Sequence, residues 1–540
     1  MIERLWLLLP ELIMLAGAVS CAIIGISRSV AVRRSLPAAA FVTLLAALVA
    51  TYVVYSGDVV SMATGDWAVP MPWLGRSLIG VSVVVGLVLV LVQAGFVDHS
   101  YETAVAEGRT RFDPLRTSRG EYYVFFLLSL CGLMLTGVAP DLIWLFLALE
   151  LTSLPTYVMV AIGRADRRAQ EAAMKYFFLG ALAAAIFLFG FAMLYGATGT
   201  MSLVEMKDVL AARIAETGSI GTLATLGLLL SIFGIAFKLA AAPLHMYAAD
   251  VYDGAAAPVT AFLGFVPKAG GVVALMLLLS ITGWMDEGGS LPEPILIALW
   301  IIAVLTMTLG NIGALLQTRV KRMLAYSSIA HSGYLLIGII AGPGAGFTAV
   351  LVYLLAYGLS NTATFAVLAS LKRGGGEVET LDDLAGLRER HPAMAWAMAI
   401  SAGSLLGFPP LLGFWGKLLL FIAGIASGHI VLVIIAAINS AISAWYYLRL
   451  IAMPLTGTPT AASRGVQRGE WEGPRIAAIV ACAALIVLPL FLNDLIEELE
   501  AGVGGGGSQA SEVGSRSIQP HVGDVGAAGG ALVSRGRVSP

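Results

Sequence analysis

Five charged side chains lie inside long apolar stretches of this 540-residue sequence. They are the carboxylate of Glu150 and the amines of Lys175, Lys238, Lys268 and Lys417. A charge at the centre of a lipid-spanning helix costs at least about 2.5 kcal/mol, so such residues face protein or water and mark ion or proton pathways. We therefore treat all five as candidate residues of a proton path.

Two of the lysines stand beside prolines that must interrupt their helices. Pro243 follows Lys238 closely, and Pro409 and Pro410 precede Lys417. Proline removes a backbone hydrogen bond, and carbonyls freed within a membrane must face water or be covered by protein. Interrupted helices in corresponding halves of a chain are typical of transporters built from inverted repeats.

Other polar residues near these breaks have two interpretations. His245 and His331 carry imidazoles, which titrate near neutral pH and can pass protons, but a hydrogen-bonded core histidine is the alternative for each. Asp250 and Asp253 either gather protons at the mouth of the path or lie on a solvated loop. Lys175 is nearer the end of its helix, so a lysine that extends to the membrane surface is the alternative there.

The composition indicates a membrane protein with many spans. Hydrophobic residues make up 58% of the chain, the mean hydropathy is +0.88, and 12% of the residues are charged, against about 25% in soluble proteins. No basic patch with interleaved aromatic residues is present, so no nucleic-acid partner is expected. Cys21, Cys131 and Cys482 are far apart within apolar stretches, which argues against a thiolate-held metal or iron–sulfur site.

Apolar stretches of about 20 residues predict about fourteen transmembrane helices. The first stretch is too long for the apolar part of a signal peptide, so we interpret it as a retained helix. The predicted spans are 5–27, 36–56, 76–97, 122–139, 141–162, 171–196, 221–242, 255–283, 294–316, 323–341, 345–370, 393–426, 429–453 and 475–493.

The placement of basic residues then assigns the sides of the membrane. Most loop arginines and lysines fall in one alternating set of loops, whereas the opposite set holds Arg4, Arg76, Lys207 and Arg213. Under the positive-inside rule the basic loops are cytoplasmic, and both termini are outside. Residues 98–120 are predicted to be a polar cytoplasmic loop, and residues 500–540 a disordered tail rich in glycine and serine.

Four segments carry the most distinctive motifs of the chain. They are PLHMYAADVYDGAAAPVTAFL at 243–263, KYFFLG at 175–180, KRMLAYSSIAHSGY at 321–334 and DLAG at 383–386. These segments resemble subunit N of respiratory complex I, an antiporter-like membrane subunit of NADH-quinone oxidoreductase, and the resemblance spans roughly residues 120–455. The lysine at position 417 and the Leu-Glu-Leu sequence around Glu150 favour subunit N over subunit M, and the chain has no long C-terminal lateral helix such as subunit L has.

The resemblance implies an all-α polytopic membrane protein with two inverted five-helix repeats, in which helices 7 and 12 are broken. The implied divisions are three helices and a loop (1–119), the first repeat (120–284), the second repeat (285–455), a final helix (456–499) and the tail (500–540). The site residues that we predict are Glu150, Lys175, Lys238, Lys268, Lys417, His245 and His331. Glu150 is expected to pair with Lys238, with Lys175 as a competing partner, and protons to continue past His245 to Lys268, His331 and Lys417.

The resemblance also implies which groups lie on other chains. No cofactor is expected on this chain, because FMN, iron–sulfur clusters and quinone belong to partner subunits. Electron transfer from NADH to quinone on those subunits is expected to drive proton pumping in this chain. The implied neighbours are subunits M, K and J in a bacterial cell (inner) membrane. The alternatives are a subunit of a multi-chain Na⁺/H⁺ antiporter, a subunit of a membrane-bound hydrogenase relative, and a purely structural membrane scaffold.

Overall fold

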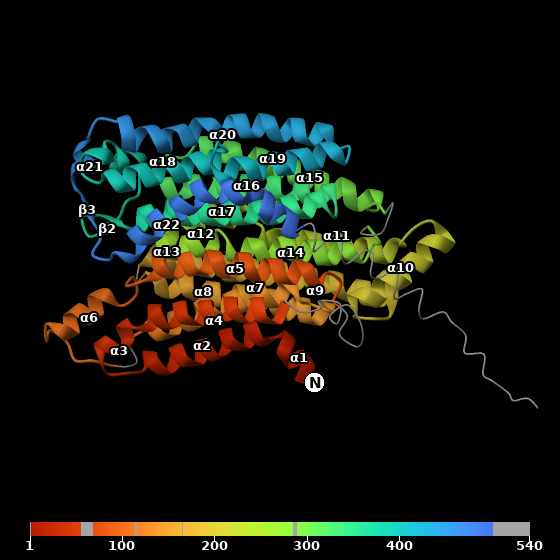
Figure 1. The fold of residues 1–540 in the computed structure, drawn as a ribbon, viewed down its shortest axis with the longest axis horizontal. Coiled ribbons are helices and arrows are strands. Elements are labelled where there is room, and N and C mark those ends of the chain that lie inside the picture. Colours follow the sequence, from red (N-terminus) through yellow and green to blue (C-terminus); the bar gives the residue numbers. More distant parts are fainter. Residues whose placement is uncertain (1, 56–68, 114–115, 165, 285–288, 500–540) are drawn as a thin grey trace, which may run out of the picture.

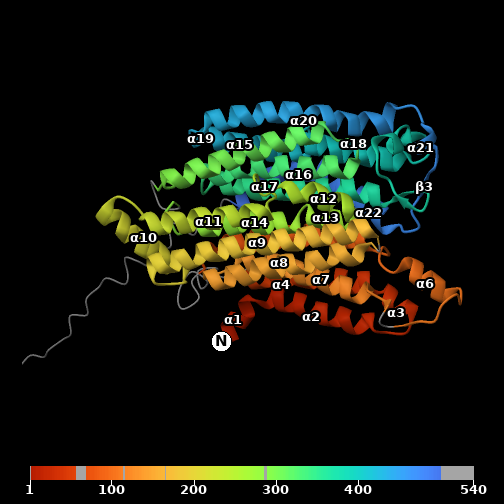
Figure 2. The same cartoon turned by 180° about the vertical axis from the view of Figure 1, so that it is seen from behind.

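The computed structural model describes residues 2–55, 69–113, 116–164, 166–284 and 289–499, so the predicted tail at 500–540 lies outside the described residues. Long helices run nearly parallel and form one elongated bundle (Figure 1). Helices α2 and α4 occupy one side of the bundle and α18 to α20 the other, as the reverse view also shows (Figure 2), whereas the last helix, α22, packs against α5 and α17. The predicted all-α membrane fold is confirmed.

The first half of the chain contains only helices among the described residues. They are α1 (Ile2–Leu7), α2 (Leu9–Gly25), α3 (Val30–Arg34), α4 (Leu36–Tyr55), α5 (Pro72–Gln93), α6 (His99–Ala106), α7 (Arg119–Gly137), α8 (Leu142–Gly163), α9 (Arg167–Thr198), α10 (Leu203–Thr217), α11 (Thr222–Lys238), α12 (Met246–Gly254), α13 (Ala257–Leu263) and α14 (Val266–Ser280).

The second half adds a small sheet to the helices. Its elements are α15 (Glu293–Leu315), α16 (Val320–Ala341), α17 (Ala345–Ala369), β1 (Leu371–Arg373), β2 (Gly376–Glu377), η3 (Leu381–Leu384), η4 (Leu387–Glu389), α18 (Pro392–Leu406), α19 (Leu412–Ala426), α20 (Ile430–Thr456), α21 (Ala461–Arg464), β3 (Val466–Arg468), α22 (Gly473–Val487) and η5 (Leu488–Phe491). The antiparallel sheet has the order β2-β1-β3, and Leu371 lies opposite Arg468 in its register. It lies at the same end of the bundle as α3, α6 and α21, opposite α10 (Figure 1).

Each predicted span contains a helix or an interrupted helix. In the described part of the chain, 11 helices are long and apolar enough to cross a membrane, and the ranges 5–27, 221–242 and 393–426 contain shorter apolar helices. The seventh and twelfth spans are interrupted at residues 239–245 and 407–411, beside the prolines that predicted this. A further interruption at residues 264–265, between α13 and α14, was not predicted.

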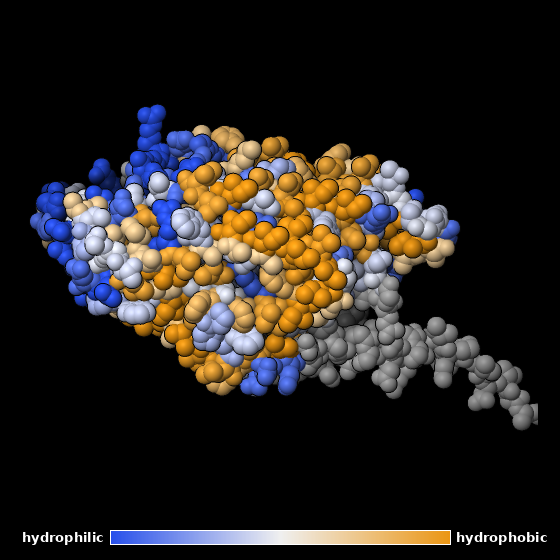
Figure 3. Space-filling view, turned by 90° about the horizontal axis from the view of Figure 1, so that it is seen from above, coloured by the Kyte–Doolittle hydropathy of each residue, from blue (hydrophilic) through white to orange (hydrophobic). Residues whose placement is uncertain are grey.

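The centre of the bundle is formed by α13–α14, α16 and α17. These helices are almost entirely buried within the chain, whereas 39% of the most apolar stretch is buried in each of α4, α9, α15 and α20. The exposed apolar side chains form a broad band with hydrophilic side chains toward both ends (Figure 3). Because lipid would cover this band, the polar residues of the central helices are separated from lipid by a layer of protein.

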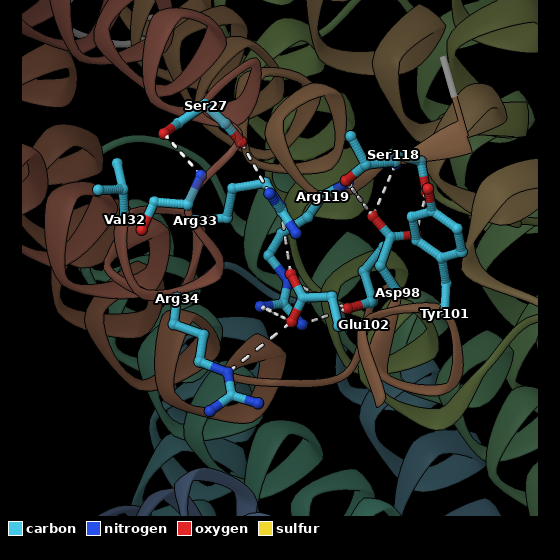
Figure 4. Close-up of polar contacts among 12 residues, drawn as sticks. Ser27, Val32, Arg33, Arg34, Asp98, Tyr101, Glu102, Ser118 and Arg119 are labelled. Carbon is cyan, nitrogen blue, oxygen red and sulfur yellow. Dashed lines mark hydrogen bonds and ion pairs between the residues drawn. The ribbon is translucent and has the colours of Figure 1, made fainter. Parts of the chain in front are cut away.

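The predicted polar loop at 98–120 contains helix α6 and a buried ion cluster that sequence analysis missed. The carboxylate of Glu102 is fully buried and lies 3.3 Å from Arg33 Nε, 3.0 Å from Arg119 Nη1 and 3.8 Å from Arg34 Nε. The carboxylate of Asp98 accepts hydrogen bonds from the residues that begin α7, including the backbone N–H of Arg119 at 2.7 Å (Figure 4). The cluster fastens α3 and α6 to the start of α7.

Candidate proton path in the buried core

An ion pair between α8 and α11 begins the candidate path. The Nζ atom of Lys238 lies 3.0 Å from Glu150 Oε1 and donates to Ser153 Oγ at 2.5 Å. The Lys238 side chain is 2% exposed and that of Glu150 is 16% exposed. A buried charge needs a partner of opposite charge, and breaking such a pair by removing one member costs about 3–5 kcal/mol. The structure therefore brings the predicted pair together.

Lys238 ends α11, and the chain then leaves the helix until α12 begins at Met246. Ala240 adopts a φ of 52°, a left-handed conformation that is rare for residues with a side chain. The freed backbone groups find partners on the second half of the chain, because Ala242 N donates to Thr306 Oγ1 at 2.9 Å and Ser332 Oγ donates to Leu239 O at 2.5 Å. The break is thus held in place by α15 and α16.

Lys268 of α14 lies next along the core and has a neutral environment. Its Nζ atom donates to the backbone oxygen of Ser328, to Ser328 Oγ at 2.8 Å and to Tyr357 Oη at 3.4 Å. Its side chain is buried, and no carboxylate of the described residues lies within 4 Å of Nζ. A cavity of about 10 Å³, lined by both Lys238 and Lys268, separates the two lysines. That volume accommodates about one water molecule.

His331 of α16 is held between two tyrosines. Its Nδ1 atom is hydrogen-bonded to Tyr353 Oη at 2.5 Å, and its Nε2 atom to Tyr447 Oη at 2.8 Å. The ring of Tyr357, whose hydroxyl also donates to Ser328 Oγ at 2.7 Å, lies 4.9 Å from the imidazole between centroids. Tyr357 therefore contacts both Lys268 and His331.

Lys417 of α19 occupies the second break. Its Nζ atom donates to Leu405 O at 3.0 Å and Leu406 O at 2.8 Å, the last carbonyls of α18, and to Ser440 Oγ at 3.3 Å. Gly407 follows α18 with a φ of 89°, and a Cβ atom there would lie 3.2 Å from Lys417 Cδ. Glycine thus supplies both the left-handed turn and the space for the lysine.

The ring of Tyr334 contacts both His331 and Lys417. Its ring centroid is 5.8 Å from the imidazole of His331 and 5.2 Å from Lys417 Nζ. The polar row therefore passes through the buried core from α8 to α19. Its members are Glu150, Lys238, Lys268, Tyr357, His331, Tyr334 and Lys417.

Two predicted residues lie apart from this row. The side chain of Lys175 is 43% exposed and pairs with Glu171 at 2.8 Å and Asp250 at 2.9 Å, not with Glu150. Asp250 also pairs with Arg322 at 2.8 Å. His245 is half-buried between the break and α12, and its Nδ1 atom has no hydrogen-bond partner among the described residues.

The serine and tyrosine partners of the row were not predicted from the sequence. Ser328, Tyr353 and Tyr357 are neutral, so their burial has a lower energetic cost than that of the lysines and gives no comparable signal. The spacing of Tyr353 and Tyr357 places them on the same face of a helix, which is the one feature that could have indicated them.

A carboxylate of the small sheet contacts residues from both halves of the chain. It lies at the end of the bundle that the basic loops predict to be cytoplasmic. Glu377 of β2 lies 2.8 Å from Lys321 Nζ and 3.5 Å from Arg164 Nη1, and it accepts the backbone N–H of Ala257 at 2.8 Å. Burial raises the pKa of Glu377, but Lys321, the Ala257 N–H and Arg164 outweigh this effect and hold the pKa below its usual value of 4.5. Because Ala257 begins α13, which leads to the Lys268 helix, Glu377 supports the position of that helix.

We predict that Glu377→Gln destabilises the chain by about 3–5 kcal/mol, since it leaves the buried Lys321 without its counter-ion. The stabilisation from a lowered carboxylate pKa is present above the ordinary value and is lost as the pH falls through the lowered one. The difference from the unaltered chain should therefore shrink below about pH 4.5. Thermal inactivation of the purified complex measures this effect, with Glu389→Gln, on an exposed carboxylate, as the control. Equal inactivation of both variants at pH 7 would contradict the role of Glu377.

Comparisons with known proteins identify the family of this chain. Residues 139–443 match the family model described as NADH:quinone oxidoreductase/Mrp antiporter, TM. NADH-quinone oxidoreductase subunit N of Trichlorobacter lovleyi is 39% identical over 388 residues, which are 70% of this chain and 76% of the relative. A chain of respiratory complex I from Thermus thermophilus with bound aureothin aligns over 91% of this chain and 100% of its own length, with a TM-score of 0.72 and 30% identity.

A chain of the Mrp complex from Dietzia sp. DQ12-45-1b aligns over 95% of this chain and 99% of its own length, with a TM-score of 0.75. Its sequence identity is 22%, so this similarity shows the shared fold alone. The family model covers more than half of the chain, and the curated relative is matched over three quarters of its length. The chain therefore belongs to the NADH-quinone oxidoreductase subunit N family, within the wider NADH:quinone oxidoreductase/Mrp antiporter family.

Proposed function

We propose that this chain is the proton-translocating membrane subunit of an NADH-quinone oxidoreductase. The observation that carries the proposal is the buried row from Glu150 to Lys417, which contains three lysines and one histidine inside the membrane domain. Titratable groups at such positions are typical of proton relays. Membership of the subunit N family supplies the electron-transfer reaction that drives them.

In the proposed mechanism the Glu150–Lys238 pair is the switch. Electron transfer on partner subunits parts the pair, and the unpaired, desolvated ammonium of Lys238 then gives up its proton. The proton passes through the small cavity to Lys268 and through Tyr357 and Ser328 toward His331. Lys417 receives it beyond His331, where α18 is interrupted. We place Lys175 and His245 at the entrance, on the side of Asp250.

The energies involved are compatible with one proton for each switching event. Moving one charge against about 180 mV costs about 4 kcal/mol, at about 2.3 kcal/mol per 100 mV. Breaking one buried ion pair changes the free energy by about 3–5 kcal/mol. One parted pair therefore suffices for one proton and falls short of the cost of two.

The same proposal includes the finer assignments made from the sequence. We propose fourteen spans with two inverted repeats at 120–284 and 285–455, flanked by 1–119, 456–499 and the tail, and both termini on the outer side of a bacterial inner membrane. Subunits M, K and J are the proposed neighbours. FMN, the iron–sulfur clusters and quinone are proposed to reside on partner subunits, so that this chain carries out no redox chemistry.

The second candidate function is that of a subunit of a Na⁺/H⁺ antiporter, because the family model that the chain matches is described for both NADH:quinone oxidoreductase and Mrp antiporter. Purified complex in sealed vesicles separates the two candidates when proton uptake is measured with NADH and quinone, without a sodium gradient. We expect uptake that requires NADH oxidation and is unaffected by sodium. Uptake that needs a sodium gradient and proceeds without NADH would reject the oxidoreductase assignment.

A further inference from the structure

A buried carboxyl group outside the row has no role in the mechanism above. Glu11 lies in the first turn of α2, and its side chain is 1% exposed. Neither carboxyl oxygen has a hydrogen-bond partner, and no basic side chain of the described residues lies within 4 Å of it. An isolated ionised carboxylate buried in an apolar environment is so costly that the group takes up a proton instead.

The surroundings of Glu11 contain further titratable groups but no cation. Helix α2 packs on α4 and α7. Tyr55, at the end of α4, is the facing group on that helix, and its buried hydroxyl also lacks a partner among the described residues. On α7 the facing group is Cys131, whose Sγ donates to the backbone oxygen of Glu11 at 3.7 Å. No cationic side chain of the described residues forms an ion pair with this carboxyl group.

A single helix separates this site from the start of the path. Cys131 of α7 faces α2, while the next residue, Gly132, faces α8. A Cβ atom on Gly132 would lie 2.4 Å from Thr152 N and 2.7 Å from the carbonyl carbon of Leu151, directly after Glu150. Because side chains of this same chain cover Glu11, its environment does not depend on a neighbouring subunit.

We propose that Glu11 is a second proton-binding site of the membrane domain, occupied by an exchangeable proton and separate from the row that runs from Glu150 to Lys417. The inference rests on the burial of the carboxyl group and on the groups around it, and does not depend on the reaction that drives the complex. The site takes a proton rather than a metal ion, since the described residues contain no group of three or more His, Cys, Asp or Glu side chains that could hold a metal.

The first test uses dicyclohexylcarbodiimide, an apolar reagent for neutral carboxylic acids, on the purified complex. The carboxyl proton moves to one reagent nitrogen, the carboxyl oxygen bonds to the central carbon, and the acyl group then shifts to nitrogen. Nothing leaves, so the peptide gains the full mass of the reagent. We expect the adduct on Glu11 and none on Glu121, an exposed carboxylate at the start of α7. An unmodified Glu11 in complex whose other buried carboxyl groups react would overturn the proposal.

The second test compares infrared spectra of the complex with those of its Glu11→Gln variant. This variant replaces a neutral acid by a neutral amide of similar size, so the complex that contains it should assemble. The expected difference is the carbonyl band of a protonated carboxylic acid, present in the unaltered complex and shifted in D₂O. Carboxylate bands in its place would show that Glu11 is ionised. A carbonyl band that does not shift in D₂O would show a purely structural acid. Neither result would bear on NADH-driven pumping, so failure here is distinct from failure of the proposed function.

Discussion

Glu150→Gln is expected to lower NADH-driven proton uptake by about tenfold or more while the complex still assembles. The variant leaves Lys238 buried beside Ser153 without a negative partner. The loss of one partner from a buried pair is worth about 3–5 kcal/mol, and about 1.4 kcal/mol corresponds to a factor of ten in rate. Quinone reduction coupled to pumping should fall in parallel, because the switch can no longer open and close.

The matched control is Glu216→Gln, which removes the charge of an exposed glutamate on α10. Proton uptake by sealed vesicles and assembly on native gels are measured for both variants. Unchanged uptake in well-assembled Glu150→Gln vesicles would reject the ion pair as the switch. A loss shared equally with Glu216→Gln would point to general damage.

Lys268→Met is expected to abolish most pumping, because Lys268 connects the ion pair of the first half with Ser328 and Tyr357 of the second. Lys268→Arg makes the prediction sharper. Arginine keeps the positive charge but does not release its proton in proteins, so it should be about as inactive as methionine if Lys268 carries protons. Activity restored by arginine would show that a fixed charge suffices and would contradict proton transfer at this residue.

Lys372→Met, on an exposed lysine of β1, is the control for the removal of a lysine. The measurement is the ratio of protons moved to NADH oxidised in vesicles. Because Lys268 is fully enclosed, the thermal stability of each variant should be recorded beside this ratio. A variant that assembles and oxidises NADH without moving protons separates transport from folding.

The breaks in the helices were predictable because proline acts locally. Proline removes a backbone hydrogen bond and favours a break in a helix. The structure interrupts both spans beside Pro243 and Pro409, although Pro155 lies within α8 and Pro454 within α20. The burial of Glu150, Lys238 and Lys417 was likewise predictable, since charge within an apolar stretch is a signal of the sequence alone. The pairing of Lys238 with Glu150 was expected from the resemblance, since the two residues lie in the fifth and seventh predicted spans, which are not consecutive.

The partners of the other candidates depend on the three-dimensional arrangement. Lys268 meets Ser328, which lies 60 residues away in the sequence, and His331 meets Tyr447, which lies 116 residues away. No local rule selects these hydroxyl groups among the many in the chain. Lys175 was placed in the path because it lies within an apolar stretch, but in the structure its amine pairs with Asp250 at the surface of the bundle. Sequence patterns therefore identified the charged residues better than the contacts that connect them.

The contacts of Lys417 couple its charge to the shape of the second break. A protonated lysine has three N–H donors, and here the amine meets three acceptors, the carbonyls of Leu405 and Leu406 and the hydroxyl of Ser440. In the proposed mechanism, a Lys417 that has released its proton keeps two N–H donors for these three acceptors, so one acceptor loses its hydrogen bond. In the proposed mechanism, the charge state of Lys417 therefore sets how many hydrogen bonds hold the end of α18 to α19.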